Sequence, residues 1–355
     1  MRNFFIMLSL LGLLSSCAKT SYLYHQGIGQ FKLLRSARPN QEVLSDAGVP
    51  VEAKERIKKI QELKDFFYKF FSRPTSGIYS KSAFLKQEAV SYLVIASPYD
   101  EVKAHEEWFP FMGDFPYLGF FAEEDAKAWA KKLDEQGLIT YVRPVYAYST
   151  LGYFEDPILS SFFHWNDWEL ANVIFHELFH TVFFIKDEID LNESLADYFA
   201  EELAKIYFKF DGDKLAEVEK KLAMQQKIDA MIRQKIDVLN ARYVTAKGNE
   251  PVLDRARAQQ VYLEFEKEFK AEGRQMCVEG KIPDEDCLPI EREWNNAAFA
   301  AFLTYDQESD RIRALRNKLQ LSLPKFLEYL EVVYKKYKKE KPDQDFADYL
   351  TAKTE

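Results

Sequence analysis

The sequence predicts an α+β fold that is mostly helical, with a small N-terminal sheet lobe in front of a larger helical lobe. Two apolar runs rich in β-branched or aromatic residues, over 89–96 and 138–149, are typical of strands. From Asp167 onward, apolar residues recur instead with the period of amphipathic helices. Strands early and helices late indicate an α+β arrangement rather than alternating βα units. With 355 residues, 47% of them hydrophobic, the chain has ample material for a core.

The elements follow from local patterns. Residues 51–71 place apolar side chains among charges at helical spacing, and residues 123–136 are also expected to be helical. Pro144 lies inside the second apolar run, which demotes that run to an edge or bulged strand. The later helices are expected over 167–185, 192–209, 213–244, 253–272, 290–304, 308–319 and 323–339.

The charge balance bears on the partners of the protein. The chain has 57 acidic and 48 basic residues, a formal net charge of −9. Proteins that bind the phosphate backbone of nucleic acids need clustered positive charge. We therefore expect no nucleic-acid partner.

Residues 1–16 are expected to be a lipoprotein signal peptide. Arg2 precedes an apolar run from Phe4 to Leu14, which as a helix would span only about 16 Å of a hydrocarbon core about 30 Å thick. The residues that end this run, Leu14 to Cys17, resemble the bacterial lipobox, in which the cysteine is lipidated. Ala18, rather than aspartate, follows Cys17, which resembles the outer-membrane sorting pattern. We expect attachment to a membrane through lipidated Cys17, on the periplasmic face of the outer membrane of a bacterial envelope. The alternative is an ordinary signal peptide with an incidental cysteine.

Two further cysteines remain if Cys17 is lipidated. Cys277 and Cys287 enclose a stretch rich in Gly, Pro and acidic residues. In an oxidising compartment an even pair at this spacing predicts a disulfide that closes a local loop. The alternative is a pair of free surface thiols.

One motif predicts chemistry. Residues His176 to His180 read HExxH, and apolar flanks indicate a buried helix, with Asn166 and Glu169 as a capping pair at its start. Histidines four residues apart share one helix face, so both imidazoles can reach one Zn²⁺ while Glu177 acts as general base on a water molecule. The alternative is a pair of core histidines packed beside a solvated glutamate.

A catalytic zinc needs a third protein ligand. Lys186 occupies the position where a metzincin has a third histidine. We expect Glu193, at the start of the next helical segment, to be the third metal ligand. Asp187, Glu188 and Asp190 also follow the motif, and they keep an aspartate ligand open as the alternative.

The residues around Glu193 predict support for the ligands. Asp197 lies four residues after Glu193 on the same helix face, and we expect it to accept a hydrogen bond from His176. Asn192 is expected to bond to His180.

The HExxH…NExxA arrangement resembles the gluzincin metallopeptidases, and its wider context is similar to a bacterial family of predicted aminopeptidases. The likeness extends over nearly the whole mature chain. Its segments are Tyr24–Gln30, Tyr117–Phe121, Ala147–Phe154 with Asp156 and Pro157, Phe175–His180, Asn192–Ala196, and Trp294–Ala297 followed by Tyr305.

The resemblance implies a zinc-dependent aminopeptidase that acts on peptides. A hydrogen-bond donor is needed where negative charge develops on the oxygen of the substrate carbonyl. Tyr305 is the first candidate for this donor and Tyr153 the second. An extended peptide could pair with the edge strand over 141–149, and the residues expected to bind substrate are Tyr148, Ser149, Tyr153, Asn295 and Asn296. The alternative for the two asparagines is that they cap or cross-link helices.

The expected organisation is one two-lobed unit. Residues 1–16 form the signal, residues 17–165 an α+β lobe with the edge strand, and residues 166–355 a helical lobe that binds zinc at the cleft. A second function stays open, that of an envelope lipoprotein with a non-catalytic zinc site that acts as a binding or assembly factor. The intact Glu177 argues against it, because structural zinc sites fill all four positions with protein ligands.

Overall fold

The computed structural model describes residues 22–109, 113–147, 155–186, 188–303, 309–340 and 344–352, and within them it confirms the mostly helical α+β fold. Residues 22–36 form the first helix. The later α-helices are α2 (Asn40–Ser45), α3 (Val51–Phe70), α4 (Glu123–Glu135), α5 (Asp167–His180), α6 (Ile189–Tyr207), α7 (Gly212–Lys247), α8 (Arg255–Gly280), α9 (Leu288–Glu291), α10 (Asn296–Leu303), α11 (Ser309–Leu319), α12 (Leu323–Glu340) and α13 (Phe346–Ala352). The strands are β1 (Arg38–Pro39), β2 (Lys81–Ala83), β3 (Ser91–Ser97), β4 (Glu107–Phe109), β5 (Gly113–Phe115), β6 (Leu118–Phe120), β7 (Ile139–Val145) and β8 (Ile158–Leu159). The 3-10 helices are η1 (Ser160–His164) and η2 (Asp284–Asp286).

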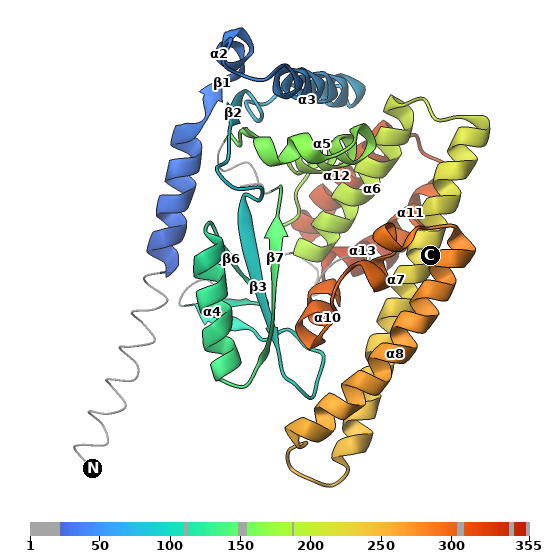
Figure 1. Ribbon diagram of the computed structural model, residues 1–355. Coiled ribbons are helices and arrows are strands. Elements are labelled where there is room, and N and C mark those ends of the chain that lie inside the picture. Colours follow the sequence, from blue (N-terminus) through green and yellow to red (C-terminus); the bar gives the residue numbers. More distant parts are fainter. Residues whose placement is uncertain are drawn as a thin grey trace.

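A three-stranded antiparallel sheet in the order β6-β3-β7 forms the centre of the N-terminal half (Figure 1). β3 and β7 pair along their whole length, from Ser97 opposite Ile139 to Ser91 opposite Val145. Among the described strands, β7 pairs with β3 alone, which confirms the predicted edge position. Pro144 is tolerated there because an edge strand has one side without ladder hydrogen bonds.

Helices cover both faces of this sheet. On one face, α4 packs Ala126, Ala130 and Leu133 against Val94 and Leu118. On the other face lies α10, flanked by the long pair α7 and α8, which run side by side (Figure 1). The sheet is therefore the middle layer of three.

The largest hydrophobic core surrounds α5. It takes apolar side chains from α3, α6 and α12 and from a second small sheet, β1-β2-β8. The Phe199 ring stacks between two others, 4.5 Å from the ring of Phe179 and 5.7 Å from that of Phe326. This core fixes the helix that bears the HExxH motif.

The cores do not follow the predicted division at residue 165. α3 precedes that residue, yet it packs on α5 in the large core. α10 follows it, yet it packs on β3 and β7. Each predicted lobe thus contributes elements to the core of the other.

The HExxH helix is shorter than predicted. It ends at His180 rather than at residue 185, and the Thr181 hydroxyl donates a hydrogen bond to the Leu178 carbonyl at its last turn. Ile185 is still fully buried, although it is not helical. The apolar pattern after His180 therefore reflects buried side chains in a segment that is not helical.

Among the later helices, the two largest differences from the predicted boundaries concern α8 and the pair α9 and α10. α8 continues to Gly280, past the predicted end at residue 272. The single helix predicted over 290–304 is two helices, α9 and α10. The break falls before Asn295, whose side-chain oxygen accepts a hydrogen bond from the Ala298 N–H and so starts α10.

Cys277 and Cys287 are joined by a disulfide, with Cα atoms 5.9 Å apart. Cys277 lies in the last turns of α8, and Cys287 directly precedes α9. Both are fully buried in the core that α7, α8 and α10 share, so neither is a surface thiol. The bond therefore ties the end of α8 to α9.

The first helix, 22–36, lies on the outside of the molecule and contacts two hydrophobic cores, the one at the sheet and the one around α5. The Tyr22 ring packs against Phe109 and Phe120 in the sheet core, and Leu33 is buried in the core around α5. None of the helices in the described ranges combines the length and the hydropathy needed to cross a membrane.

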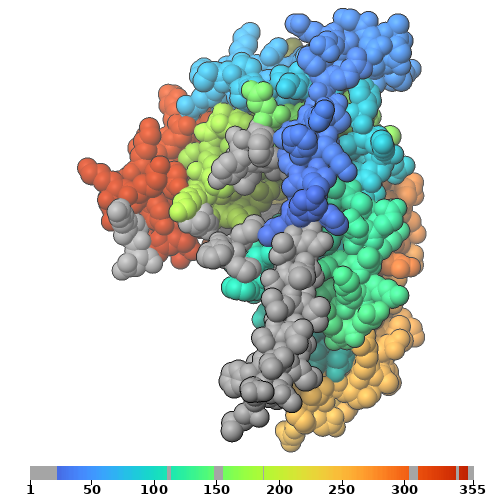
Figure 2. All heavy atoms as spheres, turned by 90° about the vertical axis from the view of Figure 1, so that its left-hand side faces the viewer, coloured from blue at the N-terminus to red at the C-terminus, as the bar shows by residue number. Residues whose placement is uncertain are grey.

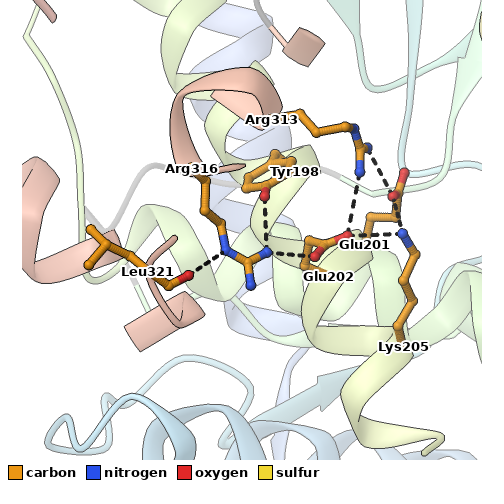
Figure 3. A network of polar contacts seen from close by, with 7 residues as sticks. All are labelled: Tyr198, Glu201, Glu202, Lys205, Arg313, Arg316 and Leu321. Atoms are coloured by element: carbon orange, nitrogen blue, oxygen red, sulfur yellow. Dashed lines mark hydrogen bonds and ion pairs between the residues drawn. The ribbon is translucent and has the colours of Figure 1, made fainter. Parts of the chain in front are cut away.

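A network of charged side chains joins α6 to α11 (Figure 3). Glu202 lies at its centre, and its carboxylate accepts hydrogen bonds from Lys205 Nζ at 2.9 Å and from Arg316 Nη1 at 2.6 Å. Arg313 donates to Glu201 at 3.0 Å. Burial alone would raise the pKa of Glu202, but the hydrogen bonds from Lys205 and Arg316 outweigh it and lower that pKa.

The Glu202→Ala substitution should lower the free energy of unfolding by about 1–3 kcal/mol, because it removes the carboxylate that the partly buried Arg316 contacts and leaves Lys205 with Glu201. Denaturant unfolding at neutral pH measures the change. The stabilisation should be fully present above the unfolded-state pKa of Glu202 and lost as the pH falls through the lower folded-state pKa.

The matched control is Glu217→Ala, which removes the exposed ion pair between Glu217 and Lys221 on α7. That change should cost less than about 0.5 kcal/mol. Equal losses in the two variants would contradict a stabilising role for the network.

Candidate metal site

Helix α5 begins at a capping box, as predicted. The Asn166 side chain accepts a hydrogen bond from the Glu169 N–H at 3.0 Å, and the Glu169 carboxylate accepts one from the Asn166 N–H at 3.0 Å. These two bonds satisfy N–H groups that the first turn of a helix leaves unpaired. The start of the HExxH helix is thereby fixed.

Helix α6 packs along α5 and brings Glu193 to the motif. Leu195 and Phe199 of α6 are buried, and Phe199 stacks on Phe179, the residue directly before His180. Because the helix backbone is rigid, this contact also fixes Glu193, which lies six residues before Phe199 on the same helix.

The three predicted ligands converge. The Nε2 atoms of His176 and His180 lie 3.2 Å apart. The Glu193 carboxylate lies 3.2 Å from His176 Nε2 through one oxygen and 3.5 Å from His180 Nε2 through the other. One ligand atom from each residue lies within 4.8 Å of the others, so the group could hold a metal ion.

Asp197 supports His176 from behind, as predicted. Its carboxylate oxygen lies 2.6 Å from His176 Nδ1. A carboxylate accepts a hydrogen bond at this position, so Nδ1 carries a hydrogen and Nε2 is the nitrogen left to coordinate a metal ion when one is bound. This is the tautomer that a metal ligand requires.

The charges in the cluster shift the pKa of each ligand. Burial alone would lower the pKa of His176, but its hydrogen bonds with Asp197 and Glu193 outweigh this and raise that pKa well above its usual value. For His180, burial first and then the charge of His176 lower the pKa to about 4. Burial opposes ionisation of Glu193, but the two histidines lower its pKa.

The donor set fits a metal ion. Two imidazole nitrogens and a carboxylate are the protein ligands of many catalytic zinc sites. Two imidazole lone pairs 3.2 Å apart repel each other unless a cation or a proton lies between them. His180 Nδ1 is buried and has no hydrogen-bond partner among the described residues. Because burial and the charge of His176 lower the pKa of His180, this ring stays neutral and its Nε2 keeps a lone pair that a metal ion could use.

Glu177 lies beside this group and is buried. Its negative charge contributes to the raised pKa of His176, and it also acts on Tyr79. Burial first, and then the charges of Glu177 and Asp156, raise the pKa of the Tyr79 hydroxyl well above its usual value. Tyr79 therefore lies near Glu177 and stays neutral.

Comparison with protein families identifies the chain. Residues 21–344 match the family described as "Putative aminopeptidase". The chain belongs to this family. Neither the curated proteins nor the solved structures that were searched include a match. The description names an aminopeptidase activity and says nothing of a metal.

Asn192 makes no hydrogen bond with His180, and that prediction was wrong. Its side-chain oxygen accepts a hydrogen bond from the Ile185 N–H at 2.8 Å, and its amide donates to the carbonyls of Ile185 and Glu188. A buried amide needs all of these partners, and the chain between α5 and α6 supplies them. Asn192 therefore holds that connection.

Asn295 and Asn296, from the segment that follows Trp294, are not brought to the metal cluster. Asn295 donates to the Thr140 carbonyl at 3.0 Å, and Asn296 donates to the Pro98 carbonyl at 2.9 Å and accepts from the Tyr243 hydroxyl. These contacts lie at the start of β7, near Ile139, whereas Val145 is at the other end of the strand. They border a cavity of about 290 Å³. The capping and cross-linking contacts of the alternative are therefore present. Both side chains also line that cavity, and their role in substrate binding stays a prediction.

The other predicted site residues lie outside the described residues. These are Cys17, Tyr148, Ser149, Tyr153 and Tyr305.

Tyr79 is the neighbour of the site that sequence reasoning missed. Its φ of +60° is unfavourable for an aromatic residue. The strained residue is held by a hydrogen bond from its N–H to the Asp156 carbonyl at 2.8 Å and by one from Asn40 to its own carbonyl at 2.8 Å. Among twenty tyrosines no local pattern marks this one, because the contacts come from residues distant in the sequence.

The Asp197→Asn substitution should weaken metal binding by about 10–100-fold, because the amide accepts a hydrogen bond from His176 less strongly and orients its ring less firmly. Competition titration of the metal-free protein with Zn²⁺ and Co²⁺ measures the affinity. The matched control is Asp190→Asn, an exposed acid in the first turn of the same helix. A similar loss in both variants would mean that only the net charge matters.

Proposed function

We propose that this protein is a zinc-dependent peptidase that removes residues from the N-terminus of peptides. The convergence of His176, His180 and Glu193, with Asp197 behind His176, carries the proposal. A site that only stabilised the fold would close all four positions of a zinc ion with protein ligands, whereas this group offers three. Membership of the family described as "Putative aminopeptidase" supports cleavage from the N-terminus of the peptide.

Zinc suits the two nitrogen donors and one oxygen donor of the site. When bound, it would supply a Lewis acid that polarises the substrate carbonyl and lowers the pKa of a water molecule. The residues of the chain then provide orientation and proton transfer.

Glu177 is the proposed general base. It follows His176 directly on α5, it is buried, and its charge acts on His176. A carboxylate in this position can take a proton from the attacking water and pass it to the leaving amine. Tyr305, in the segment between α10 and α11, is proposed to donate a hydrogen bond to the oxygen that becomes negatively charged.

The edge strand β7 is the proposed support for the peptide. It pairs with β3 alone among the described strands, so its other side can accept an extended chain. Its Val145 end packs against the core around α5, the helix that bears His176 and His180. The residues that follow, Tyr148, Ser149 and Tyr153, are proposed to contact the substrate.

The proposed location is the periplasmic face of the outer membrane, with lipidated Cys17 as the anchor. The disulfide between Cys277 and Cys287 supports an oxidising compartment, because such bonds rarely persist in the cytosol.

The Glu177→Gln substitution should lower kcat for peptide hydrolysis by at least about 100-fold, because an amide cannot accept the proton. Zinc content should stay near one ion per chain, since Glu177 is not among the ligands. Hydrolysis of a peptide library and elemental analysis of the purified protein measure the two quantities.

One result would favour the alternative of a binding or assembly factor: bound zinc with no hydrolysis above the Glu177→Gln level. Both functions require zinc at this site. If the wild-type protein binds no more zinc than the His176→Ala variant, both are contradicted.

Peptides with a free N-terminus should be cleaved at least about tenfold faster than the same peptides with an acetylated N-terminus. An aminopeptidase binds the charged amine, and acetylation removes that charge and adds bulk. Mass spectrometry of the products measures both rates and the position of cleavage. Equal rates with internal cleavage would make the protein an endopeptidase instead.

A further inference from the structure

The helix over residues 22–36 has apolar residues on two opposite faces. One face packs inward through Tyr22 and Leu33. On that face Gly29 lies so close to Phe121 that a Cβ atom at position 29 would come 2.2 Å from the Phe121 ring. The inward face is thus fully used by contacts within the protein.

The opposite face is apolar and exposed. Leu23, Tyr24 and Phe31 are 44%, 65% and 62% exposed. Leu23 and Phe31 are eight residues apart, so they lie near one another on the helix surface with exposed Gly27 between them, and Tyr24 lies beside them. The helix lies on the outer surface of the molecule (blue in Figure 2). A surface helix normally presents charged residues on this side.

The charged side chains of this helix itself are all positive, while Asp125 of α4 lies near its first turn, in the pocket that Tyr22 and His25 line. The sequence from residue 18 to residue 41 contains no Asp or Glu, although the chain has 57 of them. Exposed Lys32 and Arg35 flank the apolar face within the helix. Aromatic and aliphatic side chains bordered by basic residues are the composition of helices that lie in the interface of an anionic membrane.

We propose that the helix over residues 22–36 docks on the surface of an anionic lipid bilayer, with Leu23, Tyr24 and Phe31 inserted at the level of the headgroups. The position of the helix in the chain agrees with this occupant. Five peptide units separate Cys17 from Tyr22, so even a fully extended chain spans at most about 18 Å between them. A lipid on Cys17 would therefore hold the start of this helix close to the membrane.

This inference rests on the proposed envelope location, but the helix face can be tested without the lipid. The chain from residue 18 onward lacks Cys17 and keeps all described core residues, which begin at Tyr22. It should float with vesicles of phosphatidylethanolamine and phosphatidylglycerol in a density gradient.

The double substitution Leu23→Ser and Phe31→Ser should lower the vesicle partition coefficient by about tenfold or more, because two large apolar side chains no longer enter the interface. The matched control is Val244→Ser with Val278→Ser, which changes two apolar residues on α7 and α8 that are even more exposed, at 72% and 67%. This control should bind as the parent does. Equal unfolding midpoints verify that all three proteins fold.

Four outcomes would overturn the proposal. They are absence of flotation, equal flotation of both double variants, equal binding to vesicles of phosphatidylcholine alone, and a parent dimer that the Leu23→Ser and Phe31→Ser protein loses. The last would make a second copy the occupant of this face.

Mass spectrometry of the membrane-extracted full chain tests the anchor separately. An unmodified Cys17 together with vesicle binding by the helix would refute lipidation and leave the docking face standing. Acylated Cys17 without vesicle binding by the helix would refute the docking face alone.

Discussion

The packing of α6 against α5 sets every distance in the metal site. Each of the two helices contributes its ligands at fixed helical spacing, so the only freedom left is how they lie against each other. The stacked rings of Phe179 and Phe199 hold that arrangement one residue from His180. A shift of 1 Å at this contact would move Glu193 by a similar amount, which would exceed what the coordination of a zinc ion tolerates.

Other features of the fold protect this contact. The capping box at Asn166 fixes the start of α5. The Asn192 side chain, at the start of α6, holds the connection from α5 through two hydrogen bonds with the Ile185 backbone. The charged network centred on Glu202 holds α11 to the far side of α6. These interactions range from the exposed capping box to the buried Asn192 amide, and each constrains geometry as well as contributing to stability.

The sequence predicts most of what depends on local spacing. The fold class, the capping box, the edge strand and the convergence of His176, His180 and Glu193 all follow from helix periodicity or from a residue with one strong local effect, such as Pro144. Helix boundaries were less accurate, because Ile185 is buried for reasons of tertiary packing and looks helical in the sequence. The partners of Asn192 and Asn295 could not be found this way, since an amide can serve many partners, and only the fold decides which carbonyls lie near it. Tyr79 was missed for the same reason.

The disulfide at the end of α8 has a consequence for when the protein becomes fully folded. Thiols stay reduced in the cytosol, so a newly made chain destined for the proposed envelope location would lack the link between Cys277 and Cys287. A crosslink over so short a segment contributes about 2–3 kcal/mol in the chain-entropy description. The chain would then be less stable before oxidation than after it, and the helical half would reach its full stability only once the disulfide has formed.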